Sequence, residues 1–153
     1  MALPRLLRKS LPSIFDGRKK YEAGDPLMLD DNRPLSSQEL ELLTYLLNLS
    51  PTTQAFTAQL PFTTVTHRCK CGCPTVSLSV SAEGPATQAS QRVIVDVKAA
   101  VRDKSVGILV FADEGKLSEL EVYDLSGEIE APFPLPSIES IGMWQRSSPT
   151  TSH

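Results

Sequence analysis

Three cysteines and one histidine lie close together in the middle of the chain. The segment that contains them reads His67-Arg68-Cys69-Lys70-Cys71-Gly72-Cys73-Pro74. Three thiolates and one imidazole form a ligand set that zinc accepts in tetrahedral sites. We therefore take Cys69, Cys71, Cys73 and His67 as the candidate metal ligands, with zinc as the candidate ion.

The spacing of these residues also supports a purely structural interpretation. Zinc knuckles usually separate paired cysteines by two to four residues and take a second ligand pair from elsewhere in the chain, whereas this sequence has no distant pair. On the structural interpretation, Cys69 continues the apolar face of a strand and residues 71–74 form the turn that follows it. Arg68 and Lys70 flank Cys69 and would lower a thiol pKa, so redox or nucleophilic chemistry stays open as a third interpretation.

Two further acidic residues share one face of a predicted strand. Glu119 and Glu121 are two residues apart, which places them about 7 Å from each other along a strand. Such a pair suits acid-base chemistry, but alternating acids are more typical of a solvated strand face. The chain contains no Walker loop, GxGxxG, GxSxG or HExxH sequence, so we assign no catalytic and no cofactor-binding residue.

Length and composition indicate one ordinary globular domain. The chain has 153 residues, of which 41% are hydrophobic and 22% charged, with a net charge of -3. This charge gives no basic field for nucleic acid, and no apolar run is long enough to span a bilayer. Because the three cysteines are odd in number and confined to one short segment, a reducing, cytoplasmic location is expected.

The first predicted element is a helix that begins near Ser36. Ser36 and Glu39 have the spacing of a capping box, in which each side chain binds a backbone N–H group at the helix start. An apolar stripe at helical spacing follows and ends before Pro51; its members are Leu40, Leu42, Leu43, Leu46 and Leu47. A second short helix is predicted from Thr52 to Leu60.

From Phe62 onward the hydrophobic period changes from helical to two, which predicts strands. The five expected strands lie near residues 65–69, 76–80, 93–101, 106–112 and 117–122. In the first of them, Val65, His67 and Cys69 are expected to face the same side. Residues 113–115 read as a hairpin turn in which Gly115 takes a positive φ, and residues 132–136 are too rich in proline to pair regularly.

These elements predict an α+β fold: an antiparallel five-stranded meander sheet with one or two N-terminal helices packed on one face. Residues 1–31 are expected to form a basic, disordered arm, residues 32–145 the single α+β domain, and residues 146–153 a disordered tail. The proline-rich stretch is expected to run extended across a surface, with Ile138, Ile141 and Trp144 as its anchors.

Four segments together resemble a family of small uncharacterised bacterial proteins. They are the helix entry Arg33-Pro34-Leu35-Ser36 with Glu39, the Arg-Cys-x-Cys-Gly-Cys-Pro turn at residues 68–74, the strand at residues 107–111, and the Leu-Ser-x-Leu-Glu-Val-Tyr strand at residues 117–123. The match covers residues 32 to 140, and the cysteine turn is its most specific part. The last strand also looks like those of other small domains, some of which resemble toxin-immunity proteins. The resemblance implies a fold but transfers no activity to any residue.

The sequence leaves three hypotheses for function. The first is a non-enzymatic protein-interaction module, of the immunity kind, which binds another protein through the polar face or an edge of the sheet. The second is a metal- or thiol-dependent protein that uses Cys69, Cys71 and Cys73 with His67. The third, an enzyme that uses the two glutamates, has the least support, so we expect a protein that is not an enzyme and whose partner is another protein.

Overall fold

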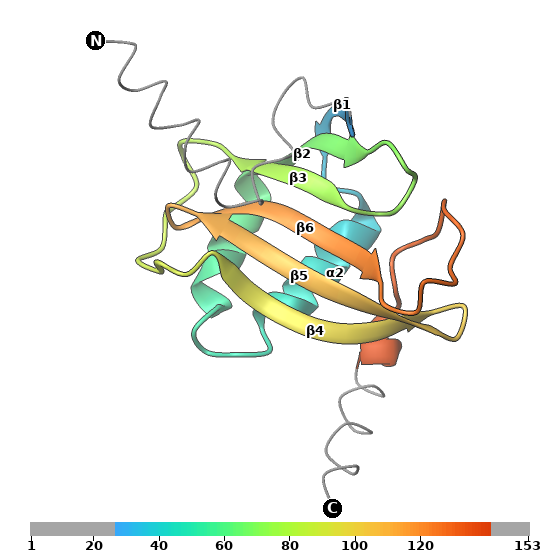
Figure 1. Cartoon of the computed structure of the whole chain (residues 1–153). Coiled ribbons are helices and arrows are strands. Elements are labelled where there is room, and N and C mark those ends of the chain that lie inside the picture. The colour runs from blue at the N-terminus through green and yellow to red at the C-terminus, as the bar shows by residue number, and fades with distance from the viewer. Residues whose placement is uncertain (1–26, 142–153) are drawn as a thin grey trace, which may run out of the picture.

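The computed structural model describes residues 27–141 of the chain. The predicted tail at 146–153, most of the predicted arm, and Trp144 lie outside the described residues. In sequence order the elements are β1 (Met28–Pro34), α2 (Ser37–Leu47), η2 (Gln54–Phe62), β2 (Thr63–Cys69), β3 (Val76–Val80), β4 (Val93–Val101), β5 (Lys104–Asp113) and β6 (Lys116–Asp124). Figure 1 shows the helices behind one face of a single curved sheet.

The α+β class and the antiparallel pairing are confirmed, but the predicted sheet was wrong in its strand number and order. The sheet has six strands in the order β1-β2-β3-β6-β5-β4, so β3 lies next to β6 rather than β4. The extra strand is β1, which includes residues 28–31 of the predicted arm. Only the first residue of β1 is buried, so this edge strand lacks the apolar alternation by which the other strands are recognised.

Helix α2 begins with the predicted capping box. The Ser36 side chain accepts from the Glu39 backbone N–H at 3.0 Å, and the Glu39 carboxylate accepts from the Ser36 N–H at 2.8 Å. The helix ends at Leu47, before Pro51, as predicted, but Leu40 is 43% exposed, so it does not belong to the buried stripe. The second helix is a 3₁₀ helix from Gln54 to Phe62.

The core lies between the helices and one face of the sheet. Leucines of α2 and Phe56 of η2 contact alternate residues of β3, β4, β5 and β6, and Phe133 and Ile141 of the C-terminal segment complete this layer. Strand β5 is buried on both faces over most of its length, as its doubly apolar sequence predicted. Within residues 27–141 no helix has the length and apolar character needed to cross a membrane.

Candidate metal-binding thiol cluster

The turn that joins β2 to β3 carries all three cysteines and is closed by backbone hydrogen bonds. The Cys69 N–H donates to the Thr75 carbonyl at 3.1 Å, and the Gly72 N–H donates to the Cys69 carbonyl at 3.3 Å. Gly72 has a φ of +97°, and a Cβ at this position would lie 3.1 Å from Cβ of Pro132. A glycine at this position therefore satisfies both the backbone conformation and the close approach of the proline.

Thr75 fixes the far end of this turn to the middle of the sheet. Its buried hydroxyl donates to the Val122 carbonyl at 3.1 Å and lies 2.9 Å from the Val122 N–H, which donates to it. At the near end, the Lys70 N–H donates to the Leu27 carbonyl at 2.8 Å. The cysteines are thus carried by a loop that is anchored at both ends.

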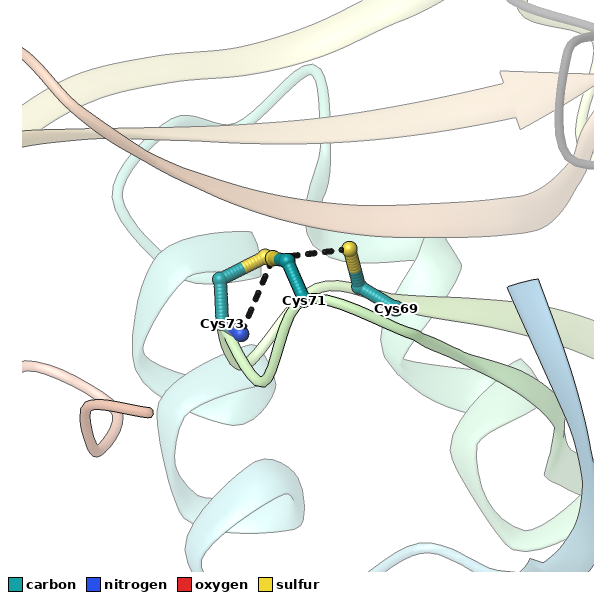
Figure 2. A group of neighbouring side chains, drawn as sticks. All are labelled: Cys69, Cys71 and Cys73. Atoms are coloured by element: carbon teal, nitrogen blue, oxygen red, sulfur yellow. Dashed lines mark hydrogen bonds between the residues drawn. The ribbon is translucent and has the colours of Figure 1, made fainter. Parts of the chain in front are cut away.

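The three thiols converge on one point at the tip of the turn. The Sγ atoms of Cys69 and Cys71 are 3.0 Å apart, and the Cys73 N–H donates to Cys71 Sγ at 3.2 Å (Figure 2). All three Sγ atoms lie within 4.8 Å of one another. None of the three is in a disulfide; Cys71 is exposed, and Cys69 and Cys73 are half-buried. Of the residues described, these three form the only group of metal-ligating side chains that meets at one point.

The surroundings of the three thiols favour a negative charge on Cys71. Burial, followed by the hydrogen bond with Cys71, raises the pKa of Cys69 to about 12. Burial disfavours the Cys71 thiolate as well, but the hydrogen bonds from the Cys69 thiol and the Cys73 amide outweigh it, and the pKa of Cys71 is lowered. Burial also raises the pKa of Cys73, against the opposing hydrogen bonds with Thr75. Cys71 is therefore the thiol that ionises first.

His67 does not join the cluster. Its Nε2 atom lies 3.3 Å from Oδ1 of Asp30 on β1, and its Nδ1 lies 3.0 Å from Oγ1 of Thr66. It is the fourth candidate ligand from the sequence, and the structure places it beside a carboxylate instead of beside the thiols.

The predicted side of His67 and Cys69 was wrong. Val65 pairs with Leu78 of β3, but His67 pairs with Ser77, because a register shift lies between Val65 and His67. An extra residue in one strand moves every following side chain to the opposite face. Cys69 therefore lies at the end of β2 on the face opposite Val65 and does not continue the apolar face of the core.

The burial of the two glutamates of β6 also differs from the prediction. Glu119 is 5% exposed, so it does not lie on a solvated strand face. It is placed between Ser77 of β3 and Phe111 of β5, whereas Glu121 pairs with Leu109 and is half-buried. The pair is part of the sheet face opposite the helices.

A cavity of about 260 Å³ borders the thiol cluster on the side of α2, and Cys69, Cys73, Arg33 and Arg68 are among its lining residues. Arg33 contacts the Glu39 carboxylate through two nitrogens, both at 2.9 Å, and Asp31 through Nε at 2.8 Å. In the sequence, Arg33 stands out only as part of the helix entry. The position of Arg33, three residues before the N-cap, identifies it as a partner of Glu39 only once the direction of β1 is known.

Comparison with known proteins gives no family for this chain. No family model, no curated protein and no solved structure matches it. The resemblance to a bacterial family, carried by the cysteine turn and the β6 strand, stays a prediction.

Proposed function

We propose that this protein binds one thiophilic metal ion through Cys69, Cys71 and Cys73. The observation that supports this function is the convergence of three Sγ atoms within 4.8 Å of one another on a loop anchored at both ends. A site of this kind needs little reorganisation on binding, because the backbone of the loop already holds the three thiols together.

The donor set fits soft metal ions. Thiolate sulfurs favour Zn²⁺ and Cu⁺ over Mg²⁺ or Ca²⁺, which prefer oxygen ligands. Zinc is the first candidate, with three protein ligands and a fourth position left for a small molecule or for His67. The exposure of Cys71 supports access to the ion from solvent.

The protonation of the thiols lowers the affinity for a metal ion. Cys69 and Cys73 have raised pKa values, so a metal ion must displace their protons at neutral pH. Cys71 has a lowered pKa and supplies the first thiolate. Binding is therefore expected to release protons to the solution.

The test is a zinc titration of the reduced full chain under anaerobic conditions, followed by native mass spectrometry and by competition with a chromophoric chelator. We expect about one zinc per chain and a large loss of affinity, on the order of 100-fold, for each of Cys69→Ser, Cys71→Ser and Cys73→Ser. Ser79→Ala, an exposed change on β3, is the matched control and should keep the affinity of the parent chain.

The pattern among the variants decides between the interpretations. Absence of stoichiometric zinc, together with a negligible effect of Cys71→Ser on stability, would support a purely structural turn and contradict this proposal. His67→Gln tests the fourth position: an affinity loss as large as that of the cysteine variants would make His67 a ligand.

The interaction-module hypothesis stays a second proposal. The observation that favours it is the open edge of strand β4, whose outward backbone groups at Asp96 and Lys98 have no hydrogen-bond partner among residues 27–141. Metal binding at the β2–β3 turn and pairing along β4 use separate parts of the sheet, so the two proposals are compatible.

A further inference from the structure

Strands β1 and β4 form the two edges of the sheet (Figure 1). The two edges differ in how they are protected. Natural edge strands avoid pairing with other chains by means of bulges and charges. Strand β1 has a register shift between Asp30 and Arg33 and carries three charged side chains there. Strand β4 is regular from Val95 to Val101, since its only register shift lies between Val93 and Val95. The β4 edge is therefore the better template for another strand.

The turn after β4 shows which backbone groups of this strand point outward. Arg102 and Asp103 have φ values of 52° and 64°, as in the two-residue type I′ hairpin turn. In such a hairpin the flanking pair, Val101 with Lys104, is a hydrogen-bonded pair. The backbone groups of alternate residues from Val101 back to Val95 therefore bond to β5. The backbone groups of the residues between them point outward from the edge of the sheet.

A contact from the C-terminal segment confirms this assignment and limits the open edge. The Ala100 N–H donates to Oγ of Ser140 at 3.2 Å, so Ala100 points outward and is already bonded. Asp96 and Lys98 point outward by the same alternation. No hydrogen bond within residues 27–141 involves their outward backbone groups, so the open stretch of the edge is centred on Val97.

The side chains along this stretch are apolar on one face and charged on the other. On the side of the helices, Ile94 and Val97 are half-buried and border a cavity of about 190 Å³ together with Leu49, which is 41% exposed. On the opposite face, Asp96 and Lys98 are exposed and carry opposite charges. An added strand would thus meet an apolar strip and one charge of each sign.

We propose that two copies of this chain associate through antiparallel pairing of their β4 strands about Val97. In this register Asp96 of one copy lies opposite Lys98 of the other, and the two-fold symmetry repeats the pair. Residues directly opposite each other in an antiparallel pair have side chains in contact, and opposite charges there stabilise the pairing. Both residues point their backbone groups outward, so each Asp96–Lys98 pair also exchanges two backbone hydrogen bonds.

The charges select this register over its neighbours. Sliding one strand by two residues keeps outward groups opposite each other but places Asp96 against Asp96, or Lys98 against Lys98, across the symmetry axis. Like charges directly opposite each other destabilise strand pairs. Beyond this stretch the Ala100 N–H already donates to Ser140, so it is not free to pair with a second copy. The pairing is therefore short, and the dimer is expected to be weak and dependent on concentration.

Sedimentation equilibrium of the full chain over a range from micromolar to millimolar tests the proposal. The buffer contains a reducing agent and a chelator, so that disulfides or metal ions at the cysteine turn cannot join the copies. Asp96→Lys and Lys98→Asp each replace two attractive pairs by two repulsive pairs, which should raise the dissociation constant about tenfold or more. The charge swap Asp96→Lys with Lys98→Asp restores two opposite-charge pairs and should restore the dimer.

Glu41→Lys is the matched control, because it makes the same charge change at an exposed position of α2 and should leave the dissociation constant unchanged. Thermal melting of each variant checks that it folds. A monomer at every concentration overturns the proposal, as does an Asp96→Lys effect no larger than that of Glu41→Lys. Failure of the charge swap to restore the dimer overturns the register about Val97.

Discussion

At the scale of single residues, Gln59 joins three separate segments through one buried amide. Its Nε2 donates to the carbonyls of Pro85 and Gly115 at 2.9 and 2.7 Å, and its Oε1 accepts from the Leu117 N–H at 2.9 Å. Gln59 thereby ties helix η2 to the long β3–β4 connection and to the β5–β6 hairpin.

We predict that Gln59→Leu lowers the free energy of unfolding by about 2–4 kcal/mol. The substituted side chain has a similar size but leaves the buried Leu117 N–H without its acceptor and removes a donor from the carbonyls of Gly115 and Pro85. Unsatisfied buried groups are costly. Chemical denaturation measures the loss. The exposed Gln54→Leu on the same helix is the control and should change the stability by about 0.5 kcal/mol or less; equal effects at both positions would contradict the bridging role of Gln59.

The identity of the thiol cluster could be predicted from the sequence, but its geometry could not. Three cysteines within five positions on a glycine- and proline-containing turn must lie near one another. Which side of the strand Cys69 occupies depends on the register shift between Val65 and His67, and alternation alone contains no signal for that shift. The same shift moves His67 to the face where Asp30 lies 3.3 Å away.

At the scale of elements, the start of α2 is an electrostatic unit as well as a cap. Glu39 receives the Ser36 N–H and both terminal nitrogens of Arg33, although it is 5% exposed. Burial acts to raise the pKa of Glu39, but the hydrogen bonds from Arg33 and Ser36 outweigh it, and the pKa is lowered from 4.5. A carboxylate with a lowered pKa stabilises the folded state when it is ionised.

We predict that this unit makes part of the stability dependent on pH. The contribution is fully present above the unfolded-state pKa of Glu39, near 4.5, and is lost as the pH falls through the lower folded-state value. Glu39→Gln should therefore cost about 1–2 kcal/mol at pH 7, and the cost should shrink as the pH falls below 4.5. Urea denaturation between pH 3 and 7 measures the difference, with the exposed Glu41→Gln as reference. A cost that stays constant across this range would contradict the ion pair.

The capping box of α2 follows from sequence because all its parts are local. Strand β1 does not, because its residues pair with β2 across 30 or more positions and carry charges and a proline where the other strands have apolar alternation. The hairpin with Gly115 was predicted, and Gly115 has the expected positive φ of 78°. Elements that depend on neighbouring residues were thus predicted, whereas an edge strand that depends on pairing with distant residues was not.

At the scale of the whole molecule, the sheet order follows from one long connection. Strands β3 and β6 are neighbours, and the chain between β3 and β4 passes to the far edge before β4, β5 and β6 return as two hairpins. Apolar periodicity predicted most of the strands but not which of them pair. A strand packed against helices has the same hydrophobic pattern whatever its place in the order of strands. The layer of helices on one face was predicted and is confirmed.

The last prediction uses two leucines of α2 to test how this layer meets the sheet. Leu43 is fully buried in the core that joins α2 to the strands, whereas Leu40, one turn earlier on the helix, is 43% exposed. Leu43→Ala should lower the free energy of unfolding by about 2–4 kcal/mol, because it removes packed atoms and leaves a cavity. Leu40→Ala changes the same atoms at nearly the same place and should cost about 1 kcal/mol or less, because its side chain already contacts water. Both variants keep full helix propensity, so chemical denaturation isolates the packing difference. Comparable losses at the two positions would mean that α2 is rotated about its axis, and the burial of Leu46 and Leu47 would have to be assigned anew.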